Sequence, residues 1–259
     1  MKDLFGDIPV MPLKNTEADH HQVMLAMALL WTPHTRANVY TLLRKLDFKR
    51  GNGHIFTLDD VKHSMQQLAA KKWLLESERN GYYRLADEQR NALYEELLGT
   101  QDVSLLRRAL YETEGFNPQH TLYSWPLYNY ESTVAIVRFA LFTRSTQAEI
   151  GRIKQLIDGT MDWSRILHDA ILSGFNEASF ARIDPALRWD FAYSAVLDLN
   201  RNWDVELLPL VNWTLLQVEG NRKQMPDYLR LAISELLLHR GERDAAFAAI
   251  KDLAGGGVD

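Results

Sequence analysis

The stretch HIFTLDDVKHSMQQLAAKKWLLESERNGYYRL, from His54 to Leu85, decides the fold predicted for this chain. A short apolar segment leads into a helical pattern, and two strand-forming segments separated by a turn follow. Thr57 is a typical N-cap residue, and the acidic Asp60 suits the first turn of a helix. The stretch therefore predicts a strand, a helix over 58–72 and a β-hairpin.

The predicted helix has one apolar side and one polar side. Leu58, Val61, Met65 and Leu68 follow the three- and four-residue spacing that places side chains on one face of a helix. The opposite face carries polar and small residues, namely Asp59, His63, Gln66, Gln67 and Ala70. We expect the apolar side to face a core and the polar side to meet solvent or a partner.

The segments around this helix predict a small sheet and two further helices. Residues 73–75 and 82–83 are strand formers, and Asn80-Gly81 favours a tight turn because both residues tolerate positive φ. Ile55 and Phe56 are expected to supply a third strand. Together with helices predicted at 17–31 and 35–46, these elements predict a winged helix-turn-helix with a small β wing. The alternative is an ordinary α+β hairpin inside a larger core.

The remainder of the chain predicts helices almost throughout. Seven segments between residues 132 and 253 show apolar spacings of three and four, with Gly, Asn or Pro at the breaks. The predicted fold class is mainly α, an N-terminal winged helix followed by an all-α array of solenoid-like hairpins. The expected parts are an arm at 1–16, a winged-helix domain at 17–99, an irregular linker with a helix at 100–130 and a helical array at 131–259. The final AGGGVD is expected to be a flexible tail or the start of a linker.

Composition indicates a globular protein. Hydrophobic residues make up 46% of the 259 residues and charged residues 24%, which is typical of a chain with a substantial core. The absence of cysteine excludes disulfides and thiolate metal sites and favours a reducing compartment. No apolar run reaches the length of about 18 residues that a membrane span requires, and the N-terminus lacks a signal-peptide pattern. We expect a cytoplasmic protein without a membrane partner.

The charge is distributed unevenly along the chain. The net charge is −5, yet residues 36–72 contain eight basic and three acidic residues, so the remainder carries −10. A basic segment within the predicted winged helix favours a nucleic-acid partner there.

No motif for catalysis or cofactor binding is present. Gly51-Asn52-Gly53 is not followed by the Lys-Ser/Thr of a phosphate loop, and neither a G-x-S-x-G elbow nor an H-E-x-x-H motif occurs. His20 and His21 are adjacent, and adjacent helical residues diverge by about 100°, which does not favour a metal site. We predict no catalytic residue, no cofactor and no metal, and therefore not an enzyme.

Two segments of the second half resemble a known family. FNEASFARIDPALRWDFAYSAVLDLNRNWD, at 175–204, has an aromatic-led turn, a short helix, Asp184-Pro185, and then Leu187-Arg188 opening a helix. LLLHRGERDAAFAAIKDL, at 236–253, has a helical-hairpin pattern. Both resemble the region that precedes the motor in large bacterial Swi/Snf-type helicases. The resemblance implies a helicase-associated module, accessory to an ATP-driven translocase on double-stranded DNA, and the motor itself is absent.

The first functional hypothesis is therefore a module that binds and positions double-stranded DNA, with the helix at 58–72 in the major groove. The residues expected to contact bases are His63, Gln66 and Gln67, and those expected to hold phosphates are Lys45, Lys49, Arg50, Lys62 and Lys71. Arg79 and Asn80 at the wing tip are expected to reach the backbone or the minor groove. Lys49, Arg50 and Lys62 are all expected to be exposed. Asp59 weighs against the hypothesis, because it lies on the same helix face.

Two alternatives remain open. Winged helices also bind proteins, as in the subunits that bind the kleisin of chromosome-organising ATPase complexes, and a defence ATPase complex is a similar setting. In either case the helical array would bind a protein partner or a fused ATPase motor. The other alternative is a transcription regulator with a helical sensor domain.

Overall fold

The computed structural model describes residues 18–77, 81–116, 129–157, 161–202, 204–221, 224–251 and 253. These residues are mainly helical, as predicted, and they contain one small sheet of three antiparallel strands. The chain divides into two compact units, the first made of residues 1–143 and 148–174 and the second of residues 144–147 and 175–259.

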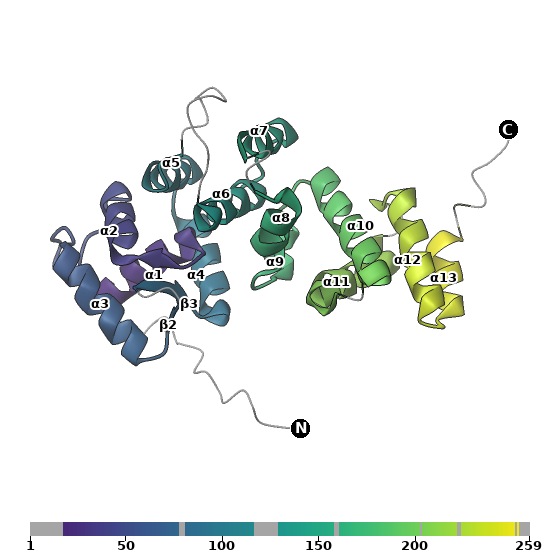
Figure 1. Cartoon of the computed structure of the whole chain (residues 1–259), viewed down its shortest axis with the longest axis horizontal. Coiled ribbons are helices and arrows are strands. Elements are labelled where there is room, and N and C mark those ends of the chain that lie inside the picture. Colours follow the sequence, from purple (N-terminus) through teal and green to yellow (C-terminus); the bar gives the residue numbers. More distant parts are fainter. Residues whose placement is uncertain are drawn as a thin grey trace. The chain divides into compact units, whose positions relative to one another are not determined.

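The first unit packs helices and a sheet around α1 (Ala18–Leu30), which contacts the next three helices and β3 (Figure 1). Its other elements are β1 (His34–Thr35), α2 (Arg36–Lys45), α3 (Leu58–Ala70), β2 (Leu74–Glu76), β3 (Tyr82–Leu85), α4 (Asp87–Thr100), α5 (Val103–Thr113), α6 (Tyr130–Phe142), α7 (Gln147–Ile157) and α8 (Trp163–Leu172).

Two helices of this unit are enclosed on all sides. Every residue of α1 from Val23 to Leu30 is buried, and so is every residue of α6 from Ser132 to Phe142. A helix that is apolar around its circumference must be covered all round. The apolar side chains that follow the helical spacing along α1 and α2 are buried; they are Val23, Ala26, Met27, Leu30, Val39, Leu42, Leu43 and Leu46.

Helix α3 begins where its sequence predicts. The Thr57 hydroxyl accepts a hydrogen bond from the Asp60 amide at 3.2 Å, and the Asp60 carboxylate accepts one from the Thr57 amide at 2.9 Å. This capping box satisfies backbone donors that the first turn leaves unpaired. Val61 and Met65 are buried as predicted, but the prediction was wrong for Leu58, which is 48% exposed. The spacing places Leu58 on the apolar side, but no described element covers the first turn there.

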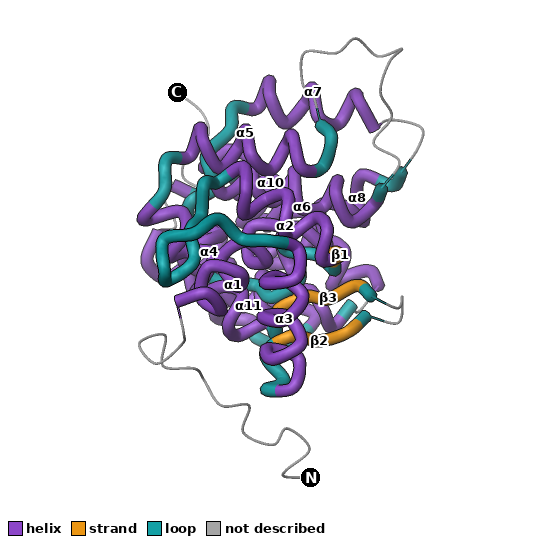
Figure 2. The backbone as a smooth tube through the Cα atoms, turned by 90° about the vertical axis from the view of Figure 1, so that its left-hand side faces the viewer, coloured by secondary structure: helices purple, strands orange, loops and turns teal. Residues whose placement is uncertain are grey.

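The sheet has the order β1-β3-β2, and its third strand differs from the prediction (Figure 2). His34 and Thr35 pair with Tyr83 and Tyr82, and β2 pairs with the other side of β3. Ile55 forms only an isolated bridge, and the neighbouring Phe56 is a buried core residue. The prediction that Ile55 and Phe56 form the third strand was therefore wrong. The two-residue strand that replaces them is too short to give an alternating pattern in the sequence.

The second unit consists of helices. An aromatic cluster lies near its start, where the Trp213 ring centroid is 4.8 Å from that of Phe180 and 5.9 Å from that of Trp189. Its helices are α9 (Glu177–Phe180), α10 (Pro185–Asn202), α11 (Leu208–Asn221), α12 (Asp227–His239) and α13 (Arg243–Ile250), with a 3-10 turn at Val205–Leu207. Helix α10 packs against α11 and α12, and α12 packs against α13.

The compact units divide the chain at different points from the predicted domains, whose boundaries stay a prediction. Helix α6, which was expected to open a separate array at residue 131, packs against α1 and α5. Within the described ranges, no helix combines the length and the apolar character needed to cross a bilayer.

Candidate functional site

The exposed face of α3 is the candidate nucleic-acid interface. Burial of Val61, Met65 and Leu68 against α1, α2 and β2 fixes the rotation of this helix, so the opposite side is turned toward solvent. Lys62 and Gln66 are exposed on that side and form no hydrogen bond or ion pair with any described residue. They are therefore available to a partner without breaking a contact with another described residue.

His63 and Gln67 lie on the same face and contact each other. The Gln67 amide nitrogen is 2.8 Å from His63 Nε2, so the two side chains are hydrogen-bonded to each other. Gln67 is half-buried, whereas His63 is exposed. A base edge bound by Gln67 would have to replace this hydrogen bond.

The end of α3 adds two exposed lysines. Lys71 places Nζ 5.1 Å from the centroid of the Trp73 ring, and Lys72 follows at a left-handed φ of 59°, where the helix has ended. Neither lysine forms an ion pair with a described residue. Lys62, Lys71 and Lys72 are thus three cations without an anionic partner in the described part of the chain. Asp59 is an exposed acid on the same helix.

Three other predicted phosphate contacts are engaged within the protein. Lys45 Nζ is 2.6 Å from Glu112 Oε2 on α5, and Lys49 Nζ is 2.5 Å from Asp47 Oδ1. Their roles toward a phosphate stay predictions, and each lysine would first have to leave its intramolecular ion pair.

Arg50 is held more firmly than either lysine. Its Nε is 2.8 Å from Asp19 Oδ2 on α1, and its Nη1 is 2.6 Å from Asp60 Oδ1 on α3. Asp19 also accepts a hydrogen bond from the Gly51 amide at 2.7 Å. Hydrogen bonds from Thr57, followed by the Arg50 charge, lower the pKa of Asp60. Arg50 is half-buried rather than fully exposed as predicted, and it joins the starts of α1 and α3.

The predicted wing-tip contacts, Arg79 and Asn80, lie outside the described residues. The next residue, Gly81, has a φ of 81°, in keeping with the turn predicted there.

His20 and His21, at which the sequence does not favour a metal site, lie in different environments. His20 is buried, and His21 Nε2 lies 2.8 Å from Glu96 Oε1 on α4. Among the described residues, no three His, Cys, Asp or Glu side chains group closely enough to hold a metal ion.

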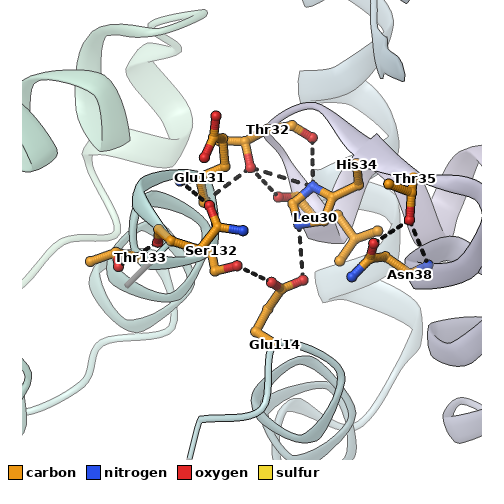
Figure 3. Close-up of polar contacts among 10 residues, drawn as sticks. Leu30, Thr32, His34, Thr35, Asn38, Glu114, Glu131, Ser132 and Thr133 are labelled. Atoms are coloured by element: carbon orange, nitrogen blue, oxygen red, sulfur yellow. Dashed lines mark hydrogen bonds and ion pairs between the residues drawn. The ribbon is translucent and has the colours of Figure 1, made fainter. Parts of the chain in front are cut away.

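A buried polar network surrounds His34 of β1, and it was not predicted from the sequence (Figure 3). His34 Nε2 is 2.9 Å from Glu114 Oε1, and the side chains are only 4% and 2% exposed. The other Glu114 oxygen accepts a short hydrogen bond from the Ser132 hydroxyl. His34 Nδ1 lies 2.8 Å from the Thr32 carbonyl oxygen, and the Thr32 hydroxyl donates to the Glu131 carbonyl at 3.0 Å. The network thus joins the α1–β1 turn to the end of α5 and the start of α6.

This network does not have the geometry of a nucleophilic triad. In such a triad the histidine lies between the hydroxyl and the carboxylate. Here the carboxylate of Glu114 lies between Ser132 and His34, so the histidine is not positioned to take a proton from the serine. The arrangement can hold a charge and fix the adjoining elements, but it does not activate a nucleophile.

A second buried group surrounds Trp31, which has a left-handed φ of 65°. The guanidinium carbons of Arg138 and Arg90 lie 3.2 and 3.8 Å from the centroid of its ring. Arg138 binds the Ala170 carbonyl and Arg90 binds the Trp31 carbonyl. Burial lowers the pKa of both groups, that of Arg90 to about 10. These cations stack on an aromatic ring and serve the packing of the first unit.

Comparisons of the chain with protein-family models, with curated proteins and with solved structures found no match. The function must therefore be argued from the residues and their geometry.

Proposed function

We propose that this chain is a non-catalytic module that binds double-stranded DNA through α3, and that its first unit contains a winged helix. The element order α1, β1, α2, α3, β2, β3 with the sheet order β1-β3-β2 supports the winged-helix assignment. The single observation that carries the DNA proposal is the exposed face of α3, where Lys62 and Gln66 have no described partner and two more lysines follow.

In this proposal α3 lies in the major groove. Gln66 and His63 meet base edges, since a glutamine side chain can pair with adenine through two hydrogen bonds. Lys62 and Lys71 bind phosphates on either side of the groove and set the position of the helix. Arg79 and Asn80 contact the backbone or the minor groove from the wing, as the sequence predicts.

The proposed setting is cytoplasmic and accessory to a larger machine. Few unpaired cations imply modest affinity for DNA, because phosphate neutralisation supplies most non-specific binding. The helices of the second unit would bind a protein partner or an ATP-driven translocase, as the Swi/Snf-type resemblance implies. Leu231 and Leu238 on α12, which are 55% and 54% exposed, support a protein-binding role for these helices.

The experiment is a fluorescence-anisotropy titration of the full chain with a labelled random duplex at two salt concentrations. The test variant is Lys62→Gln with Lys71→Gln, and the control is Lys154→Gln with Lys251→Gln. The control changes the net charge equally, at exposed lysines on α7 and after α13. Weaker binding by the test variant alone is the expected result, and equal binding by both variants would refute the assignment of α3.

A second candidate function is that of a winged-helix protein-interaction subunit. The observation that favours it is apolar exposure at the start of α3, where Ile55 is 50% and Leu58 is 48% exposed. Exposed apolar side chains suit a protein surface better than a phosphate backbone. If the unmodified chain does not bind the duplex even at low salt, this candidate replaces the DNA proposal.

A further inference from the structure

We propose that His34, Glu114 and Ser132 form a pH-sensitive latch, which holds β1 against α5 and α6 only while the His34 ring carries two protons. This inference concerns the fold of the first unit and does not depend on DNA binding. Figure 3 shows the polar groups around the His34 ring.

Both ring nitrogens of His34 face oxygen atoms that accept hydrogen bonds. Nδ1 is 2.8 Å from the Thr32 carbonyl oxygen, which cannot donate. Nε2 is 2.9 Å from Glu114 Oε1, and the other oxygen of this carboxylate already accepts from Ser132. A neutral imidazole has one N–H and one lone pair, so it would direct a lone pair at one of these oxygens. The doubly protonated ring carries an N–H on each nitrogen, and its charge makes the 2.9 Å contact with Glu114 an ion pair.

The charged and titratable groups around the His34 ring also favour its doubly protonated state. Glu114 faces it from the end of α5, and Glu131 acts on it from the first turn of α6. Across the sheet its partner is Tyr83, whose ring centroid is 5.9 Å from the guanidinium carbon of Arg36. Two carboxylates thus act on one imidazole.

The pKa values of His34 and Glu114 shift in opposite directions. Burial on its own lowers the pKa of His34, but the hydrogen bond and the charge of Glu114, the Thr32 carbonyl and the Glu131 charge outweigh it and raise the pKa. Burial on its own raises the pKa of Glu114, but the contacts with His34 and Ser132 lower it. The folded protein therefore keeps the His34 proton to a higher pH than the unfolded chain does.

The sign of the pH effect follows from linkage. The contribution of His34 to stability is complete below its unfolded pKa of about 6.5 and is lost as the pH rises through the raised folded value. In that window the folding equilibrium constant falls by up to about tenfold per pH unit for one proton. The contribution of Glu114 is lost at the acid end, as the pH falls through its lowered pKa.

Loss of the His34 proton would affect β1, which is a small element. Strand β1 has two residues, it pairs only with β3 in the described sheet, and Thr35 within it caps α2. Once the ring repels one of its acceptors, β1 keeps its pairing with Tyr82 and Tyr83 but loses its ion pair with Glu114 at the end of α5. We therefore expect opening to be confined to β1, β3 and the start of α2.

The first test is an NMR titration of the histidine ring protons in the full chain, which has eight histidines. His34→Gln identifies the His34 signal, and free histidine in the same buffer is the reference. The His34 signal is expected to titrate at a higher pH than free histidine, and Glu114→Gln is expected to move it down. A His34 midpoint at or below that of free histidine would overturn the proposal.

The second test measures opening itself, by amide hydrogen exchange of the unmodified chain from pH 6 to pH 9. After correction for the intrinsic exchange rate, protection in β3 is expected to fall with pH while protection in α12 stays constant. Since this test uses no variant, a His34→Gln chain that does not fold leaves it intact. If β3 and α12 change in parallel, His34 does not act as a latch.

Discussion

Replacing Lys62 with Gln should reduce the salt dependence of duplex binding by a predictable amount. The structure leaves three lysines on and after α3 without an ion-pair partner among the described residues, namely Lys62, Lys71 and Lys72. If each neutralises one phosphate, these lysines contribute about −2.7 to the slope of log K against log salt, which is a loss of affinity of about 40-fold between 50 and 200 mM salt. Without Lys62 their contribution becomes about −1.8, which is a loss of about 12-fold over the same range.

The same titration tests whether the basic residues that are held in ion pairs also bind phosphates. If Lys45, Lys49 and Arg50 also left their ion pairs to bind phosphates, about six contacts would give a slope near −5.4 and a loss above about a thousandfold. The assay is fluorescence anisotropy over four or more salt concentrations, with Lys154→Gln as the control that should leave the slope unchanged. A slope that is the same with and without Lys62 would refute the placement of α3 against the phosphates.

Three further predictions concern stability, each measured by urea denaturation of the full chain. Thr57→Ala removes the hydroxyl that caps α3 and should lower the free energy of unfolding by about 1 kcal/mol; no change would show that the cap is dispensable. Leu29→Ala opens a cavity in the enclosed helix α1 and should cost about 2–5 kcal/mol, whereas the 60%-exposed Leu216 should tolerate Ala, and equal costs would contradict the described core. Gly174→Ala should cost about 1–2 kcal/mol, because Gly174 has a φ of 66° and a new Cβ would lie 3.1 Å from Arg90 Nη2; a neutral effect would mean that this turn can relax.

Helix starts and buried faces could be predicted because they depend on neighbours within one or two turns. Thr57 and Asp60 are three residues apart, so the capping box requires nothing but the helix that it starts. The apolar spacing of Val39, Leu42 and Leu43 likewise indicates a buried face whatever covers it. Leu58 shows the limit of this reasoning, because its spacing matches the buried face but its place in the first turn leaves it exposed.

The candidate interface was predicted in part for the same reason. The polar face of α3 follows from its own sequence, and His63 and Gln66 are exposed there as the periodicity indicates, with Lys62 exposed beside them. Arg50 was predicted to be exposed but is half-buried. A basic residue in a glycine-containing loop gives no sign of a partner in the sequence. Its pairing with Asp19, 31 residues earlier, exists because the fold brings the start of α1 to this loop.

The sequence by itself therefore determined the mainly helical character, the start of α3, the two strands of the hairpin and the polar face that we propose to bind DNA. Only the tertiary structure decided that His34 forms the third strand and that its ring meets Glu114, 80 residues later, inside the first unit. The physical reason is the separation along the sequence over which each interaction acts. Capping and amphipathic spacing are interactions among near neighbours, whereas a buried ion pair stabilises the fold only after separate helices have excluded water around it.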